Sequence, residues 1–521
     1  MIPVSRDLLF TLAVVVACAA TLSCADSSST GNPPSNPPTH RVASPRSDFD
    51  AFLAAADAAE ARFPADKLNR CLAYPDPPLS HWSHPVVAAY CQYLFQPAIA
   101  VSDVRELIDH GHAKELDQRL ADALQAQLSQ HSARGLLDRI FAQDFDEAPD
   151  DLRPVLDKWK SQSPNSAFAL AASGDAYVAA ADRARGGDYI ENTPQHKIDA
   201  MDQLMTLAKA DLEKAVAIEP RLTPVYTSMI DAGGHVLGRQ YAQDAAARGL
   251  HVDPSNFDIY AKLLWLAQPK WGGSEAEIIA ITNQAQEHAS DNPLLMLLKV
   301  EPQAATLGLD DCGCRADSAP DYYELFDQAA VGGLLESAGL TSAAAHKNGP
   351  AAIYLSEAFR FGWGVPENIS AKINALVELH KPESALGLAN RHLALKPDDE
   401  ERLELRAMVY SQMKDSADAE KDMLKILSIT KDDLWVLNNL AHTYVENTHE
   451  WDKAWAITDR LIKEYPGKSD GWLLRGMIQA NQPRPGLKDT VDYYQAHFGD
   501  DPDEQTNLNA LKYWLAHSAA K

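Results

Sequence analysis

Two segments of this chain repeat each other and decide its fold: ALGLANRHLALKP at residues 385–397 and AEKDMLKILSITK at residues 419–431. Their first residues are 34 positions apart (419 − 385 = 34). Matching positions at offsets 0, 4, 7 and 12 are Ala385, Ala389, His392 and Pro397 in the first segment, and Ala419, Met423, Ile426 and Lys431 in the second. Small and apolar residues at helical spacing let one helix dock closely on another, and a proline ends the unit because it cannot continue a helix. The stretch 385–466 therefore predicts repeated helix pairs.

The 34-residue period resembles that of the tetratricopeptide repeat. The resemblance implies antiparallel helix pairs that stack into a right-handed α-solenoid, an all-α fold that binds other polypeptides. We expect the better-preserved repeats to fill residues 371–521. A more divergent block is expected at residues 166–300, where Ala167 as position 1 places Ser173 and Gly174 at positions 7 and 8 of a first helix.

The divergent block carries an insertion. Its second helix is predicted around Ala208 and Leu212, which is later than the repeat period allows, so Gly186–Pro194 and its flanks are extra chain. Insertions in repeat arrays lie on one face, and that face is often the binding face. The loop Gly186–Pro194 is therefore a candidate contact with a partner.

Charge and composition narrow the class of function. The chain has 521 residues and a formal net charge of −26, which opposes binding to nucleic-acid phosphates and to anionic lipid head groups. Aromatic residues make up 8% of the chain, and alanine and leucine are abundant, as in all-helical proteins. We therefore expect a protein or peptide partner and no nucleic acid.

Residues 1–24 resemble a secretory leader of the lipoprotein type. Arg6 precedes an apolar run, Leu8–Leu22, which is too short for a permanent membrane span. Cys24 follows a small residue and is predicted to be the lipidated residue. The alternative is ordinary cleavage that releases a soluble periplasmic protein.

Residues 25–47 are rich in serine, asparagine and proline, a composition that predicts an extended tether instead of a packed core. A tether directly after a lipidated cysteine suits a periplasmic protein held at a membrane. In the lipoprotein family, Ala25 after Cys24 favours the outer membrane. Contact with the membrane is expected only through this lipid anchor.

Residues 48–165 are predicted to be helical apart from a proline-rich loop between Cys71 and Cys91. Four cysteines remain after the leader and allow three pairings, of which Cys71–Cys91 with Cys312–Cys314 is the most local. A zinc site is the alternative, because two thiolates and two imidazoles suit tetrahedral zinc. That site would use Cys71, His81, His84 and Cys91. Oxidation of periplasmic thiols favours the disulfide.

The segment Pro269–Ser274 has paired glycines but lacks the spacing of a phosphate-binding loop. We expect Ser274 to cap the next helix, with Glu277 completing a capping box, and Trp271 to fill a gap between helices. Together with the stretch Cys71–Pro75, this turn resembles an uncharacterised family of Gram-negative bacteria, a domain of unknown function, over roughly residues 50–300. That resemblance implies no known activity.

Two further segments separate the repeat blocks. Residues 301–320 contain Cys312-Gly313-Cys314 and are predicted to form a loop with a structural disulfide or a free thiol pair. Residues 321–370 contain Ala358–Pro366, which resembles a Sel1-like repeat, a relative of the tetratricopeptide repeat whose first helix ends in a Gly-x-Gly-Val turn.

The tetratricopeptide resemblance also implies which residues face a ligand, since positions 2, 5, 9 and 12 of each first helix commonly do. In the unit that starts at Glu400 these are Glu401, Glu404, Met408 and Ser411. In the unit that starts at Leu434 they are Trp435, Asn438, His442 and Val445. The Lys, Asn and Arg set that grips a C-terminal carboxylate in chaperone-binding members is missing, which argues against an acidic carboxylate ligand.

No Ser-His-Asp arrangement, paired-carboxylate loop or phosphate-binding glycine loop is recognisable in the sequence. We therefore expect a scaffold that mediates protein–protein interaction or assembly, with no catalytic residue and no cofactor. A zinc-dependent or thiol-redox protein, centred on Cys71, His81, His84 and Cys91, is the alternative.

Overall fold

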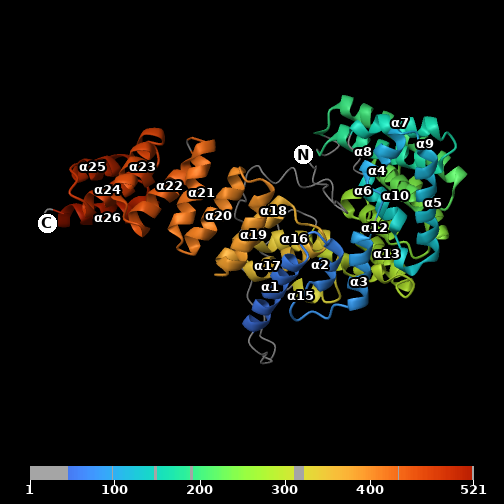
Figure 1. The fold of residues 1–521 in the computed structure, drawn as a ribbon, viewed down its shortest axis with the longest axis horizontal. Helices are drawn as coiled ribbons and strands as arrows, with labels where there is room; N and C mark the ends of the chain where they lie inside the picture. Colours follow the sequence, from blue (N-terminus) through green and yellow to red (C-terminus); the bar gives the residue numbers. More distant parts are fainter. Residues whose placement is uncertain are drawn as a thin grey trace. The chain divides into compact units, whose positions relative to one another are not determined.

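The structure is a computed structural model that describes residues 45–96, 98–145, 150–187, 192–309, 322–431 and 433–518. Within these ranges the chain forms helices joined by turns and no strand, which confirms the predicted all-α fold of tetratricopeptide-like helix pairs (Figure 1). The chain divides into two compact units, Met1–Asn368 and Ile369–Lys521, called unit 1 and unit 2 below. None of the helices in the described ranges has the length and apolarity to cross a bilayer.

The predictions for the leader, for lipidation at Cys24, and for Cys312 and Cys314 lie outside the described residues. Two predicted boundaries change. Helix α1 already begins at Pro45, inside the predicted tether, and Glu301–Leu307 is helix α14, although residues 301–320 were expected to be a loop.

Unit 1 contains the first seventeen α-helices of the chain. They are α1 (Pro45–Arg62), α2 (Lys67–Ala73), α3 (His84–Phe95), α4 (Val101–Asp109), α5 (Ala113–Ser129), α6 (Leu136–Asp144), α7 (Arg153–Gln162), α8 (Ala167–Arg185), α9 (Gln195–Ile218), α10 (Thr223–Ala232), α11 (Arg239–Val252), α12 (Phe257–Leu266), α13 (Glu275–Glu287), α14 (Glu301–Leu307), α15 (Tyr322–Leu325), α16 (Gly332–Ala344) and α17 (Asn348–Arg360). A π-helical segment, Gly233–Leu237, follows α10, and a 3-10 helix, Pro293–Val300, precedes α14.

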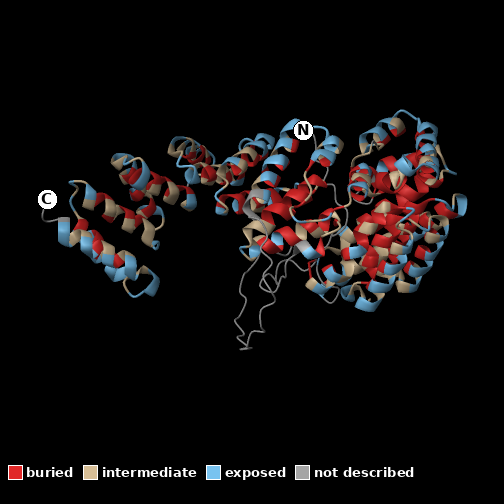
Figure 2. Cartoon of the chain, turned by 90° about the horizontal axis from the view of Figure 1, so that it is seen from below, coloured by how far each residue is buried: buried red, intermediate tan, exposed pale blue. Residues whose placement is uncertain are grey.

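The interior of unit 1 consists of two hydrophobic clusters. One runs from α4 to α12 and includes Leu116, Leu120 and Leu124, which are spaced four residues apart on one face of α5 and are buried. The other joins α2 and α3 to α12 and to the helices that follow it, as far as Trp363. In Figure 2 the buried residues lie on the inward faces of the helices. Unit 1 therefore returns its last helices onto its first ones.

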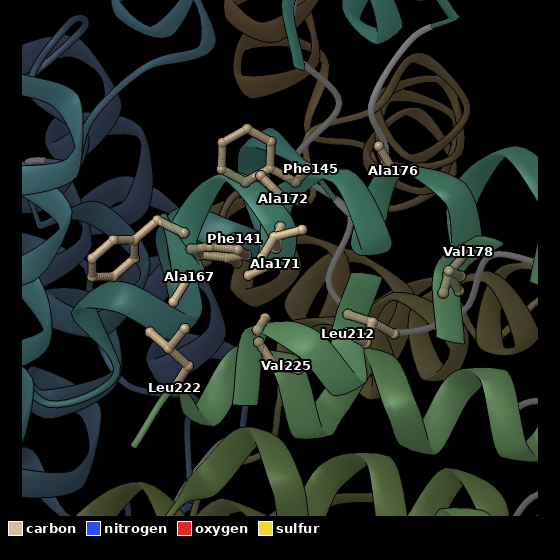
Figure 3. Packing of buried hydrophobic residues seen from close by; sticks show 14 of the residues in the cluster. Phe141, Phe145, Ala167, Ala171, Ala172, Ala176, Val178, Leu212, Leu222 and Val225 are labelled. Atoms are coloured by element: carbon tan, nitrogen blue, oxygen red, sulfur yellow. The ribbon is translucent and has the colours of Figure 1, made fainter. Parts of the chain in front are cut away.

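Helices α8 and α9 form the first pair of the divergent block. Gly174 lets them approach closely, because a Cβ at this position would lie 2.6 Å from Leu212 Cγ of α9. Figure 3 shows Leu212 in the same cluster as Ala171 and Ala172 of α8. Much of the predicted insertion is helical, since α8 extends to Arg185 and α9 begins at Gln195.

The turn before α13 was predicted in part. Ser274 caps α13, since its hydroxyl accepts from Glu277 N at 3.3 Å. The predicted capping box does not form, because the Glu277 carboxylate turns away from the helix start and accepts a hydrogen bond from Arg239. Trp271 fills a gap between helices as expected, packing on Trp265 at 4.6 Å between ring centroids.

Unit 2 begins within α18 (Pro366–Glu378) and continues with α19 (Pro382–Leu395), α20 (Glu400–Gln412), α21 (Ser416–Ile429), α22 (Leu434–His442), α23 (Trp451–Glu464), α24 (Ser469–Asn481), α25 (Leu487–Phe498) and α26 (Gln505–Ser518). A π-helical segment, Thr443–Asn447, follows α22. Aspartates cap the starts of α20, α21 and α22: the side chains of Asp399, Asp415 and Asp433 each accept a backbone N–H of the first turn.

The 34-residue register starts earlier than the sequence predicted. First helices begin at residues 332, 366 and 400, and second helices begin at 348, 382 and 416, so each step is 34 residues (366 − 332 = 34; 382 − 348 = 34). The turn inside each pair contains a residue with positive φ: His346, His380, Lys414 and His449. Phe361–Val365 therefore follows the second helix of a pair, not the first, and the Sel1-like reading of residues 321–370 is corrected to the tetratricopeptide register.

Candidate partner-binding surface

The predicted ligand-facing residues of unit 2 lie on two first helices, α20 and α22. Glu401 and Ser411 of α20 are exposed, and Glu404 and Met408 are partly buried. On α22, Trp435 is an exposed large apolar side chain, with 38% of its surface accessible, and Asn438 and His442 are partly exposed. Seven of the eight predicted positions thus keep some contact with solvent.

Val445 is the exception, because only 2% of its surface is accessible and it belongs to the hydrophobic core of unit 2. Its predicted role in ligand contact is wrong. Helix α22 ends at His442 and continues as the π-helical segment Thr443–Asn447, whose wider turn rotates later residues away from the α-helical register. The position rule assumes an uninterrupted α-helix.

Glu404 is a carboxylate without a donor. No hydrogen bond or ion pair from the described part of the chain reaches it, and its pKa is raised to about 6. Burial is the main cause, and the negative charges of Asp433, Glu401 and Glu400 add to it. The surroundings of Glu404 are therefore acidic, and a cation brought there would stabilise the ionised carboxylate.

The arginines of α20 do not neutralise this surface, because both bind neighbouring helices. Arg402 donates from Nη1 to the carbonyl of His392 in α19 at 2.8 Å. Arg406 donates from Nε and Nη2 to the Asp422 carboxylate in α21, both at 2.7 Å. Arg402 thus ties α20 to the preceding helix pair, Arg406 ties α20 to its own partner α21, and both charges are engaged away from Glu404.

Asn438 offers a second acceptor on this face. Its Nδ2 donates a long hydrogen bond to Asp470 Oδ2 at 3.4 Å, and its buried Oδ1 has no partner among the described residues. His442 lies one turn further along α22 and pairs through Nδ1 with Glu446 Oε1 at 3.1 Å. We call the face made by Glu401, Glu404, Trp435, Asn438 and His442 the acidic face.

The four residues of the alternative zinc site do not come together. Cys71 and Cys91 are bonded to each other as a disulfide, and both are fully buried. His81 and His84 have side chains that are 83% and 87% exposed, and they face Asp327 and Asp76 respectively. Elsewhere in the described ranges, three or more His, Cys, Asp or Glu residues are nowhere arranged to hold a metal ion.

The disulfide loop is docked against helices far away in the sequence. Arg360 at the end of α17 is buried and donates from Nε to the Cys71 carbonyl at 2.9 Å. Its Nη1 bonds the Asp76 carboxylate at 2.9 Å and the Glu357 carboxylate at 3.2 Å. Trp82 Nε1 also donates to the Phe326 carbonyl at 2.6 Å. We call this set of contacts the Arg360 clamp.

Both segments that the Arg360 clamp connects are distinctive in the sequence, but the sequence does not show that they contact each other. Cys71–Pro75 and Ala358–Pro366 were each noted as distinctive stretches, and the clamp shows why. One signal was available: an arginine between two phenylalanines, Phe359 and Phe361, in an apolar stretch needs buried acceptors.

Comparisons with known proteins add little to this geometry. No family model matches the chain, so the resemblance to a family of unknown function is not supported. No curated protein matches it significantly either. Among solved structures, the crystal structure of the APC/C hetero-tetramer Cut9–Hcn1 aligns with a TM-score of 0.31 and 13% identity, over 89% of this chain and 94% of that one. A likeness at this score is too distant to support a statement about this chain.

Proposed function

We propose that this protein is a helical-repeat scaffold whose acidic face binds an extended segment of a partner protein that carries a basic side chain. The observation that carries the proposal is Glu404, a partly buried carboxylate among like charges with no donor in the described chain. Trp435 on the next repeat offers an apolar contact beside it, and Asn438 Oδ1 offers an acceptor for a backbone N–H. Binding, not catalysis, is the proposed activity, and no cofactor or nucleic acid takes part.

The test is selection of short peptides from a displayed random library by the purified full chain. We expect enrichment of an arginine or lysine near an apolar residue, because a charge-assisted bond to a partly buried carboxylate outweighs an exposed ion pair. Glu404→Gln should weaken the selected peptides about tenfold, and Trp435→Ala by at least as much. Isothermal titration calorimetry measures both changes.

Glu383→Gln is the matched control, since it removes one negative charge from the exposed first turn of α19 in the same unit. Its effect on affinity should be less than about twofold, in line with a long-range charge alone. Enrichment of acidic peptides, or equal losses in Glu383→Gln and Glu404→Gln, would count against the proposal.

We further propose that the scaffold is periplasmic and anchored to the outer membrane by a lipid on Cys24. The support is the sequence alone: an apolar run, Leu8–Leu22, then Cys24, then a stretch rich in serine and proline. In a Gram-negative host, Cys24→Ser should abolish incorporation of labelled palmitate and release the protein from the membrane fraction. Cys18→Ser should leave both unchanged, whereas unaltered labelling of Cys24→Ser would favour a soluble periplasmic protein.

A further inference from the structure

A small cavity of about 20 Å³ lies inside unit 1, between the start of α6, the start of α12 and the 3-10 helix Pro293–Val300. Three aspartates line it, Asp138, Asp253 and Asp258, together with Arg134. A cavity needs roughly 10–15 Å³ to hold a water molecule. The volume is therefore enough for one water and too small for an organic ligand.

The Asp138 side of the cavity is already saturated with hydrogen bonds. Asp138 Oδ1 accepts from Thr223 Oγ1 at 2.6 Å, and Oδ2 accepts from Gln127 Nε2 and Asn256 Nδ2, both at 2.8 Å. Gln127 Oε1 in turn accepts the backbone N–H of Leu137 at 2.7 Å. This network joins α5, α6, α10 and α12. It uses both carboxylate oxygens of Asp138, so neither oxygen is left to bind a molecule in the cavity.

The Asp258 side is incomplete. Asp258 Oδ1 accepts from the Tyr93 hydroxyl of α3 at 2.5 Å, but Oδ2 is buried without a partner. Arg134 Nη1, in the same cavity wall, is also buried without a partner. A Cβ built on Gly135, next to Arg134, would lie 3.8 Å from Asp258 Oδ2. Arg134 and Asp258 both line the cavity, so within the described part of the chain its wall includes one residue with an orphan donor and one with an orphan acceptor.

The titratable groups around the cavity come from α3, α6, α12 and the residues that precede α6 and α12. Helix α3 contributes Tyr90 and Tyr93, α6 contributes Asp138 and Arg139, and α12 contributes Asp258 and Lys262; Arg134 precedes α6 with His131 beside it, and Asp253 precedes α12. The cations lie on the Asp258 side, where Arg139 and Lys262 favour the ionised carboxylate. Asp138 instead faces the negative charges of Asp258 and Asp253.

The pKa values of Asp138 and Asp258 reflect this uneven distribution of charge around the cavity. Burial, with the Asp258 charge adding to it, raises the pKa of Asp138 to about 8. Burial raises the pKa of Asp258 only to about 6, because the Tyr93 hydrogen bond and Arg139 oppose the rise. The two carboxyls titrate as a coupled pair, which keeps a proton to a higher pH than two separate exposed aspartates would.

We propose that the cavity binds one water molecule that bridges Arg134 Nη1 to Asp258 Oδ2, and that the buried pair Asp138 and Asp258 makes this site a pH-sensitive tie between α3 and the α6–α12 core. When the pair loses its last proton, two buried carboxylates repel each other across the cavity. Both carboxyls have pKa values raised above those of the unfolded chain, which lie at about 4, so the stability they contribute is complete below about pH 4 and is lost as the pH rises from there to about 8.

The test uses the full chain and follows thermal unfolding, together with hydrogen exchange of peptides from α3 and α6, between pH 6 and pH 9. The wild-type midpoint should fall by several degrees, with faster exchange in α3. Asp138→Asn mimics the neutral acid, since its amide oxygen accepts from Gln127 and Asn256 and its amide nitrogen donates to Thr223. Its midpoint should change much less over this range.

A wild-type midpoint that stays constant, or an Asp138→Asn midpoint that falls as steeply as the wild type, would overturn the titration half of the proposal. If Asp138→Asn fails to fold, Asp258→Asn replaces it: this change removes one of the two repelling charges but leaves Asp138 buried, so its midpoint should fall less than that of the wild type over this range. A crystal structure at pH 7 tests the other half: density for a water within hydrogen-bonding distance of Arg134 Nη1 and Asp258 Oδ2 is expected, and an empty cavity contradicts it.

Discussion

Arg360→Met should destabilise unit 1 by about 3–5 kcal/mol, the usual cost of removing one partner of a buried charge pair. Arg360 is 2% exposed, and its guanidinium donates to the Cys71 carbonyl, to Asp76 Oδ1 and to Oε2 of the fully buried Glu357. Methionine matches the length of the side chain but donates no hydrogen bond, so buried acceptors lose their donor. Urea unfolding followed by tryptophan fluorescence measures the loss.

Two further variants separate the clamp from a general effect of charge. The double variant Arg360→Met with Glu357→Gln should recover part of the loss, because it no longer leaves a buried carboxylate beside an apolar side chain. Arg119→Met removes an exposed arginine that pairs with Glu115 within α5, and it should cost less than about 1 kcal/mol. Equal unfolding midpoints for Arg360→Met and Arg119→Met would show that the clamp contributes little.

Gly174→Val should also destabilise unit 1 strongly, by about 2–3 kcal/mol. A Cβ at this position of α8 would lie 2.6 Å from Leu212 Cγ, closer than packed side chains approach. The helices must then move apart or leave their preferred rotamers, which typically costs 1–3 kcal/mol. Thermal and urea unfolding of the purified chain measure the change.

Leu212→Ala in the Gly174→Val background should cost less than the sum of the two single changes, because the smaller side chain makes room for the new methyl groups. Gly349→Val is the matched control, since Gly349 lies in α17 with no atom within 4 Å of its ideal Cβ. Its effect should stay within about 0.5 kcal/mol. Strict additivity of Gly174→Val and Leu212→Ala would contradict the proposed contact.

The helix pairs could be predicted because their signal is local. Small residues such as Gly174 and Ala385 recur at fixed spacing wherever two helices must touch, and this spacing survives in the sequence. The 34-residue register of residues 332–366 was missed. Its close-packing glycine is Gly339, which lies against Leu355, but the Gly-rich turn at Phe361–Val365 is the more conspicuous pattern in this segment and suggested a different repeat.

The Arg360 clamp could not be predicted, because its partners are separated by 289 positions and leave no periodic pattern. Val445 was misplaced for a different reason. A π-helical turn depends on the packing of the whole repeat, and no pattern in the residues from Leu434 to Asn447 predicts it.

The acidic face was predicted in its residues but not in its electrostatics. Position rules placed Glu404, Trp435 and Asn438 on one surface. Whether Glu404 has a partner depends on where Arg402 and Arg406 turn, and side-chain direction along a helix is decided by the neighbouring helices α19 and α21. Only the three-dimensional arrangement shows that both arginines are engaged elsewhere.

The Arg360 clamp also changes how unit 1 should unfold. In an open repeat array each pair contacts only its neighbours, so the ends can fray and unfolding proceeds in steps along the chain. Unit 1 instead ties its second helix to its seventeenth, and the residue Trp82 before α3 to Phe326 after α15, which makes it a closed ring in terms of connectivity. A ring has no free end from which to peel, so its unfolding is expected to be a single cooperative event. Unit 2 has a regular order of pairs, in which each pair follows the previous one along the chain, so its melting is expected to proceed in steps.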